Sequence, residues 1–307
     1  MRRESLLRKN LKFAGSSVGE PWWVLGDVTR KLLEPLGYQV EVLTASASTN
    51  NPRFVGGGKA DFGATVPETL GWAIRGEENF KGETLLPLRA IGRVRRPSWL
   101  TAAVRYETGF TSLEQIAASG RPIRLATNDL DSIASVVPKK VLAYYHLTKD
   151  EIEANGGEVR KMRDVDWRGG DIDVIITNLY MGRTAVTKHW MTASEHMNLR
   201  FLDLADDLIA QLQADGHGKP GHVPFHFLRG IDRRVKALDR VDGIIIYCPA
   251  ETDEEFVYTL TKLYDTNRDE FFSQAVHMAW DPAAVTNTEP VELHPGAVRY
   301  YREAGLL

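Results

Sequence analysis

Glycine and hydroxyl residues form the first group whose types and spacing could do chemistry. Residues 15–19 read Gly-Ser-Ser-Val-Gly and stand between an apolar stretch, 11–14, and a helical pattern, 22–36. If this loop opens a helix, its free N–H groups and the helix dipole favour a carboxylate. Ser16 and Ser17 are therefore predicted to bind a ligand, and the alternative is a plain turn without one.

The same loop formally matches the Gly-x-Ser-x-Gly nucleophile elbow, with Ser17 as the nucleophile. That motif normally follows several strands, whereas here it follows the first. A hydrolase also needs a carboxylate and a histidine behind the serine, and His294 is available by count only. We therefore do not favour a serine hydrolase. Gly58-Lys59 lacks the flanking residues of a P-loop, and no dinucleotide fingerprint appears.

A short pattern occurs twice, in residues 58–65 (GKADFGAT) and 170–177 (GDIDVIIT). Each copy has a glycine, an aspartate and an apolar run that suits a buried parallel strand, and each ends at a threonine. In open α/β sheets, ligands bind beyond the carboxyl ends of the strands. Thr65 and Thr177 are therefore predicted to reach a ligand.

Two further stretches offer neutral hydrogen-bonding groups. Residues 44–51 read TASASTNN, from which Ser48 and Asn50 are predicted to orient a ligand with few desolvation costs. The alternative is a solvent loop that caps the next helix, and we expect at least one of these side chains to do only that. Asn178 and Tyr180 follow the second repeat; Tyr180 either closes over a ligand or belongs to the core.

The loop at residues 127–132 holds the place in the second half that residues 15–19 hold in the first. Thr127, Asn128 and Ser132 are its predicted ligand-binding residues. Its two aspartates would repel a carboxylate unless they point away, or they could meet a cationic group of the ligand.

Arginine and tryptophan side chains could complete such a site. A run of three arginines, Arg93, Arg95 and Arg96, flanks the predicted hinge, and one of them could make a bidentate contact with a carboxylate. The alternative is a solvated charge cluster, and within the run we prefer Arg93 or Arg95. We favour Arg93 for the site. Four tryptophans could form the wall of a pocket for an aromatic or apolar ligand body: Trp22, Trp23, Trp72 and Trp99. For each of them, packing between helix and sheet is the alternative. Trp22 and Trp23 are adjacent on one helix, so both cannot face the same way.

Three histidines lie close together in the sequence: His217, His222 and His226. The first two belong to residues 216–224, where glycine and proline predict a loop, and the third follows directly after it. Three imidazoles can bind zinc, but these are not spaced i, i+4 on a clear helix. We predict a surface loop, no metal and no cofactor.

Bulk properties exclude several classes of protein. The 307 residues are 43% hydrophobic and 26% charged, which is ordinary for two globular lobes. The net charge of −3 gives no basic excess, so no nucleic-acid partner is expected. Cys248 is the only cysteine, so an internal disulfide is impossible. No intact secretion signal is recognisable: the chain is periplasmic if a signal peptide has been removed, and cytoplasmic if Met1 is the native start.

The elements that must position these residues repeat one order: strand, polar loop, helix, then a Gly-x-x-Asp strand. This order predicts an α/β fold of two lobes, each a mixed sheet flanked by helices. The lobes are predicted at residues 1–94 with 249–307 and at 95–248, hinged by two crossing strands, with the second crossing after the apolar strand 241–247. The other helices are predicted at 68–75, 112–118, 133–145, 203–213, 253–267 (capped by Thr252) and 295–305.

The chain resembles the TAXI-type solute receptors of tripartite TRAP transporters, which have the type II periplasmic binding protein fold. The most specific matching stretch is Leu-His-Pro-Gly-Ala at 293–297. The others are Gly15-Ser16-Ser17 before Trp22-Trp23, residues 46–51, residues 58–63 and residues 256–262.

The resemblance implies a solute-binding receptor that takes a small organic acid, aromatic carboxylates included, in the interlobe cleft and closes on it by hinge bending. Its further partners would be membrane transporter subunits. The alternative is a cytoplasmic enzyme on the same fold, a decarboxylase or lyase, with Glu20, Asp131 or a histidine as general acid or base. A third hypothesis is an intracellular ligand sensor. We favour the non-enzymatic receptor.

Overall fold

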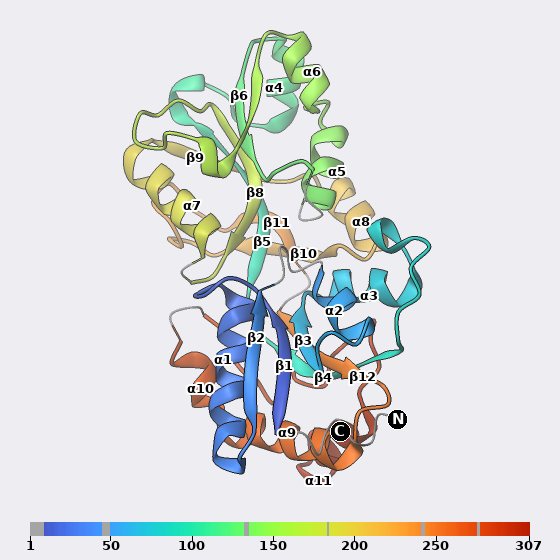
Figure 1. Ribbon diagram of the computed structural model, residues 1–307. Helices are drawn as coiled ribbons and strands as arrows, with labels where there is room; N and C mark the ends of the chain where they lie inside the picture. Colours follow the sequence, from blue (N-terminus) through green and yellow to red (C-terminus); the bar gives the residue numbers. More distant parts are fainter. Residues whose placement is uncertain (1–8, 45–49, 132–134, 183, 241–242, 275–276) are drawn as a thin grey trace. The chain divides into compact units, whose positions relative to one another are not determined.

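The computed structural model describes residues 9–44, 50–131, 135–182, 184–240, 243–274 and 277–307 (Figure 1). The chain forms two compact units. Unit 1 comprises Met1–Arg96 and Asp242–Leu307, and unit 2 comprises Pro97–Val241. Each unit is built on one mixed β-sheet with helices packed against it, which is the α/β organisation that the repeated element order predicts.

The sheet of unit 1 has the strand order β2-β1-β3-β12-β4. β1 is parallel to β2 and β3, whereas β12 is antiparallel to β3 and β4. The carboxyl ends of β1 to β4 therefore lie at one edge, which we call the carboxyl edge of unit 1. The strands are β1 (Asn10–Gly15), β2 (Gln39–Thr44), β3 (Phe62–Thr65), β4 (Leu88–Val94) and β12 (Ile244–Pro249).

The helices of unit 1 cover both faces of this sheet. Residues of α1, α9 and α11 pack on one face with Phe13 and Phe62, and residues of α2 and α3 pack on the other with Ala14 and Ile245. α1 begins at a proline, which suits the first helical turn, and the turn after it ends at Gly37 with φ +83°. The helices are α1 (Pro21–Leu33), η1 (Glu34–Leu36), α2 (Asn51–Gly56), α3 (Pro67–Arg75), η3 (Glu78–Phe80), α9 (Glu254–Thr266), α10 (Asp269–Phe272) and α11 (Pro295–Glu303).

The sheet of unit 2 has the order β10-β11-β5-β8-β6-β7, and β9 also pairs with β5. β6, β7 and β8 are parallel, so their carboxyl ends share one edge, the carboxyl edge of unit 2. The strands are β5 (Ser98–Arg105), β6 (Arg124–Thr127), β7 (Glu158–Lys161), β8 (Val174–Tyr180), β9 (Leu199–Leu202), β10 (Gly218–Val223) and β11 (Val235–Arg240).

Two cores fill the faces of this second sheet. One contains apolar residues of α4, α5, α6 and α8, and the other is centred on Trp190 of α7. The helices are η4 (Tyr106–Thr108), α4 (Leu113–Ser119), α5 (Val136–Tyr144), α6 (Lys149–Ala154), η6 (Met162–Asp164), α7 (Ala185–His196) and α8 (Asp206–Ala214).

The aspartate of each repeated pattern has the same local role. Asp61 accepts a hydrogen bond of 2.7 Å from the backbone N–H of Lys12 in β1. Asp173 accepts one of 2.9 Å from the backbone N–H of Arg124 in β6. Both pairs are 49 residues apart, so the repeat is a repeat in three dimensions. Each aspartate fixes where two neighbouring parallel strands begin to pair.

The prediction of a loop at residues 216–224 is wrong. From Gly218 the segment forms β10, which pairs antiparallel with β11, and Pro220 lies opposite Leu238. β10 is the last strand on this side of the sheet, where a proline without an N–H is tolerated. Glycine and proline therefore marked an edge strand here.

Two further predictions need correction. The apolar strand that we placed before the return crossing is β12, and it pairs with β3 and β4 inside unit 1. The return to unit 1 therefore precedes this strand instead of following it near Cys248. α9 is capped by Asp253, whose carboxylate accepts from the N–H of Phe256 at 2.9 Å, and not by Thr252.

Candidate functional site

Ser16 lies directly after β1 at the carboxyl edge of unit 1 and is only 9% exposed. Its hydroxyl oxygen accepts a hydrogen bond of 3.2 Å from the backbone N–H of Trp23 in the first turn of α1. Glu20, which precedes the helix, makes no side-chain capping bond. Ser16 therefore caps α1 from outside the helix. Ser17 is exposed, and its carbonyl accepts from the N–H of Glu20.

Arg93 and Thr65 share one face of the sheet. Both lie opposite Ile245 of β12, Thr65 from β3 and Arg93 from β4, and residues that face each other across paired strands point to the same side. Thr65 is fully buried and Arg93 is 7% exposed. The register thus brings a hydroxyl and a guanidinium group, both predicted from the sequence, to one row at the carboxyl edge.

Arg96 is the residue of the arginine run that our choice of Arg93 or Arg95 missed. It is 5% exposed, and its guanidinium carbon lies 5.4 Å from the ring centroid of Trp22. Arg95, by contrast, is 45% exposed at its side chain and forms an ion pair of 2.9 Å with Asp281. Since β4 and β1 are separated by two strands, Arg96 reaches across the carboxyl edge to the start of α1.

Trp22 presents a polar atom at the same place. Its indole nitrogen is buried and has no hydrogen-bond partner among the described residues. A buried N–H without an acceptor is unfavourable, so this donor fits an acceptor that is supplied from outside the described residues. Trp22 and Trp23 are both partly buried and pack against the core of unit 1.

Asn50 and Asn51 show how the polar stretch after β2 is used. The Asn50 oxygen accepts from the Arg53 guanidinium at 2.8 Å. Asn51, fully buried, donates to the carbonyl of Ala64 at 2.7 Å, and its own side-chain oxygen has no partner within the described part of the chain. Both asparagines therefore organise α2 and β3. Ser48 and Ser132, also predicted for the site, lie outside the described residues.

Thr127, Asn128 and Thr177, which were predicted for the site, lie together at the carboxyl edge of unit 2. Thr127 is fully buried and donates to the carbonyl of Ile176 at 2.6 Å. Thr177 is fully buried too, and its hydroxyl donates to the side-chain oxygen of Asn128. These bonds tie the end of β6 to β8 and position Asn128.

Asn178 and Tyr180 complete β8. Asn178 is 3% exposed, and its side-chain oxygen has no hydrogen-bond partner among the described residues. Its backbone carbonyl accepts from the indole N–H of Trp190 at 3.0 Å. Tyr180, partly buried, accepts through its carbonyl from the Thr187 hydroxyl at 2.9 Å.

Asp129 does not repel an anion in the way that its position suggested. Its carboxylate pairs with Lys161 at 2.9 Å and with Arg163 at 3.2 Å. The hydrogen bond from the Lys161 ammonium lowers the pKa of Asp129, so the carboxylate stays ionised and paired. The second aspartate of this loop, Asp131, is exposed.

Several alternative chemistries find no geometric support in the described residues. No hydrogen bond there joins the Ser17 hydroxyl to a histidine, and no group of histidine, cysteine and carboxylate side chains could hold a metal ion. His294 caps α11, since its Nδ1 accepts from the N–H of Gly296 at 3.2 Å. Cys248 is buried, and burial raises the pKa of its thiol to about 12, so it is not a nucleophile. Trp72 and Trp99 are core residues.

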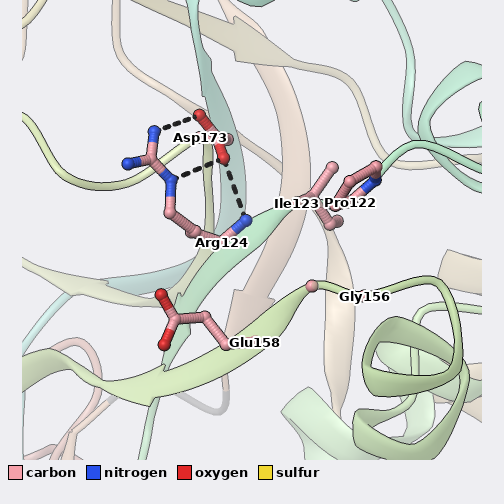
Figure 2. A pocket seen from close by; sticks show the side chains of 7 residues that line it. Pro122, Ile123, Arg124, Gly156, Glu158 and Asp173 are labelled. Carbon is pink, nitrogen blue, oxygen red and sulfur yellow. Dashed lines mark hydrogen bonds and ion pairs between the residues drawn. The ribbon is translucent and has the colours of Figure 1, made fainter.

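A depression of about 580 Å³ lies at the opposite edge of the unit 2 sheet, where β6 and β7 begin (Figure 2). Arg124 and Asp173 face each other in it through bonds of 2.8 and 2.9 Å. Arg160 and Asp171 extend the ion pairs, and Glu158 pairs with Arg160. Because these charges pair with one another, the depression is a structural ion network.

The family of the chain follows from a match over residues 13–305. The chain belongs to the NMT1-like family. No curated protein matches it. None of the helices in the described segments has both the length and the apolar character that a bilayer crossing needs.

Solved structures give the fold. PhnD1 from Prochlorococcus marinus, in complex with methylphosphonate, is similar with a TM-score of 0.51 and 11% identity over 97% of this chain and 99% of that chain. XAC2383 from Xanthomonas citri, bound to chloride ion, has a TM-score of 0.49 and 14% identity over 97% and 98%. The sulphonate binding protein SsuA from Escherichia coli has a TM-score of 0.46 and 12% identity over 96% and 83%.

The likeness to PhnD1 extends along nearly the whole of both chains and confirms the predicted fold, a two-sheet α/β fold of the type II periplasmic binding proteins. The chain thus shares its fold with PhnD1. The narrower predictions, a TAXI receptor and an organic acid as solute, remain proposals.

Proposed function

We propose that the chain is a solute receptor of a TRAP-type transport system and binds a small organic acid. The observation that carries the proposal is the donor-rich carboxyl edge of unit 1. Two guanidinium groups, those of Arg93 and Arg96, are buried there. Arg96 lies over the ring of Trp22, whose indole N–H lacks an acceptor among the described residues. An organic anion has the complementary chemistry.

The energetics favour an anion with several oxygen atoms. Hydrogen bonds between a guanidinium and a carboxylate are charge-assisted and about twice as strong as neutral ones. Burial strengthens them further, because the local dielectric constant is lower than that of water. Arg96 also holds a cation–π contact with Trp22, which fixes the guanidinium plane and reduces the entropy lost on binding.

Unit 2 would supply the neutral groups in this proposal. Thr177, Asn128 and Asn178 offer hydroxyl and amide groups at its carboxyl edge, and the Asp129 carboxylate there is paired with Lys161 and Arg163. A receptor role would place the chain in the periplasm with membrane transporter subunits as partners.

The test is a thermal-shift and ligand NMR screen of the purified protein with paired compounds. Each mono- or dicarboxylic acid, aliphatic or aromatic, is compared with its uncharged primary amide. Binding to the folded state alone raises the free energy of unfolding by about 2.7 kcal/mol at 100 times the Kd. We expect one group of acids, and none of the amides, to raise the Tm while staying chemically intact.

Two results would contradict the proposal. Equal shifts with acids and amides would show that the negative charge is not recognised. NMR signals that decay into product would instead support the enzyme hypothesis, a decarboxylase or lyase on the same fold.

A further inference from the structure

The side-chain oxygen of Asn178 is a buried acceptor without a donor. The residue is 3% exposed, and no hydrogen-bond partner of this oxygen exists among the described residues. Burying an acceptor without a partner carries the full desolvation penalty of the group. Such an atom calls for a physical reason, since buried polar groups in folded proteins are nearly always paired.

The strand register places Asn178 at the carboxyl edge of unit 2. On one side it lies opposite Leu100 of β5. On the other side, β6 pairs with β8 only as far as Ala126 opposite Ile175, and it ends at Thr127. β8 therefore continues past the end of β6, and Asn178 belongs to the continuing part. This is where ligands of such sheets bind.

Two neighbouring hydroxyl donors of the described residues are used by other acceptors. The Thr177 hydroxyl donates to Asn128, and the Thr127 hydroxyl donates to the carbonyl of Ile176. The bond from fully buried Trp190 to the Asn178 carbonyl holds the backbone in place at this residue. The backbone of Asn178 is thus held in place, and neither hydroxyl is directed at its side-chain oxygen.

We propose that Asn178 Oδ1 accepts a hydrogen bond from the bound solute. The solute class is then an acid that carries an O–H or N–H donor in addition to its carboxylate, such as a hydroxy acid or an amino acid. This inference rests on the proposed function, that of a receptor for small organic acids. It adds a requirement that the anion-binding edge of unit 1 does not impose.

The first test compares ligands on the unaltered protein. Isothermal titration is run with acids of one carbon skeleton: a plain acid, its 2-hydroxy acid and its 2-amino acid, in an aliphatic and an aromatic series. We expect at least one donor-bearing acid to bind about 10 to 100 times more tightly than the plain acid of its series. The hydroxy and amino arms distinguish the two sources of the donor.

The second test uses a matched pair of variants. Asn178→Leu removes the acceptor at similar volume. Thr101→Val is the control: the Thr101 hydroxyl is fully buried and likewise lacks a partner in the described residues. Thr101 lies opposite Thr177, one position from Leu100, and therefore points to the other face of the sheet. We expect Asn178→Leu to abolish the preference for the donor-bearing acid and Thr101→Val to retain it.

The outcomes separate this inference from the proposed function. If acids bind but the donor-bearing acids have no advantage, the inference is overturned and the receptor proposal stands. The inference is likewise overturned if Asn178→Leu keeps the preference. If no acid binds at all, both are refuted. The ligand comparison on the unaltered protein decides the question even if a variant fails to fold.

Discussion

The two copies of the Gly-x-x-Asp pattern should differ in how much each stabilises the fold. Asp173 accepts three bonds from Arg124: 2.9 Å from its backbone N–H, 2.9 Å from Nε and 2.8 Å from Nη2. Its side chain is 17% exposed and that of Arg124 is 33% exposed. Asp61 accepts a 2.7 Å bond from the Lys12 N–H in an exposed setting.

These contacts give an estimate for Asp173→Ala and Asp61→Ala. A hydrogen bond to a charged group is worth about 1.5–3 kcal/mol, and removing one partner of a buried ion pair costs about 3–5 kcal/mol. Because Arg124 keeps its partner Asp171 and is partly solvated, we expect Asp173→Ala to cost about 2–4 kcal/mol. For Asp61→Ala we expect about 1 kcal/mol.

The assay is urea unfolding together with native-state hydrogen exchange, because two units need not unfold as one transition. Asp173→Ala should raise the exchange rates of amides in β6 and β8 while leaving those of β1 and β3 unchanged. Asp61→Ala should do the reverse, with the smaller effect. Equal losses for the two variants, or a loss spread evenly over both sheets, would refute the reasoning.

The dependence of the free energy of unfolding on pH in the acid range gives an independent check on the contribution of Asp173 to stability. Burial alone would raise its pKa, but the hydrogen bonds and charge of Arg124 outweigh burial and lower it below the ordinary value of 3.8. A carboxyl with a lowered pKa contributes stability that is present above its unfolded pKa and is lost as the pH falls towards the folded pKa. Asp173→Asn should therefore flatten the loss of stability of the unaltered protein below about pH 4.

Three further outcomes are expected. Burial lowers the pKa of His294, whose neutral Nδ1 caps α11 by accepting from the Gly296 N–H. The free energy of unfolding should therefore fall as the pH drops below about 6.5. This fall should be smaller in His294→Asn, which keeps a capping oxygen. The Cys248 thiol should resist iodoacetamide until urea unfolds unit 1. Arg229→Met should lower the Tm by several degrees in a thermal melt, because the Arg229 guanidinium donates to the Ser194 and Met197 carbonyls at the end of α7.

Local patterns predicted much of this fold. The apolar spacing and the glycine stop of α1 predicted a helix close to its observed bounds, and the two Gly-x-x-Asp stretches predicted β3 and β8. β10 could not be predicted in this way, since glycine and proline are typical of loops and only its pairing with β11 makes it a strand. The residues of a short segment do not show which other strand it will pair with.

The site shows the same limit at the level of single side chains. Thr65 ends β3 as predicted, whereas the prediction that a strand ends at Thr177 is wrong, because β8 continues to Tyr180. Within the arginine run, however, Arg95 is bound by Asp281, which is 186 residues away, whereas Arg96 lies over Trp22. No spacing in the sequence distinguishes these two neighbours. The position of the Asn178 side-chain oxygen, which lacks a donor among the described residues, likewise depends on where β6 ends relative to β8.

The central claim is that the carboxyl edge of unit 1 recognises an organic anion, and the most direct measurement compares two neighbouring arginines. The Kd of the best acid is measured by isothermal titration for the unaltered protein, Arg96→Gln and Arg95→Gln. We predict that Arg96→Gln weakens binding about 10- to 100-fold, because it removes a charge-assisted contact. Arg95→Gln, which removes the ion pair with Asp281, should change the Kd less than about threefold. Equal effects of the two variants, or undiminished affinity in Arg96→Gln, would contradict the account.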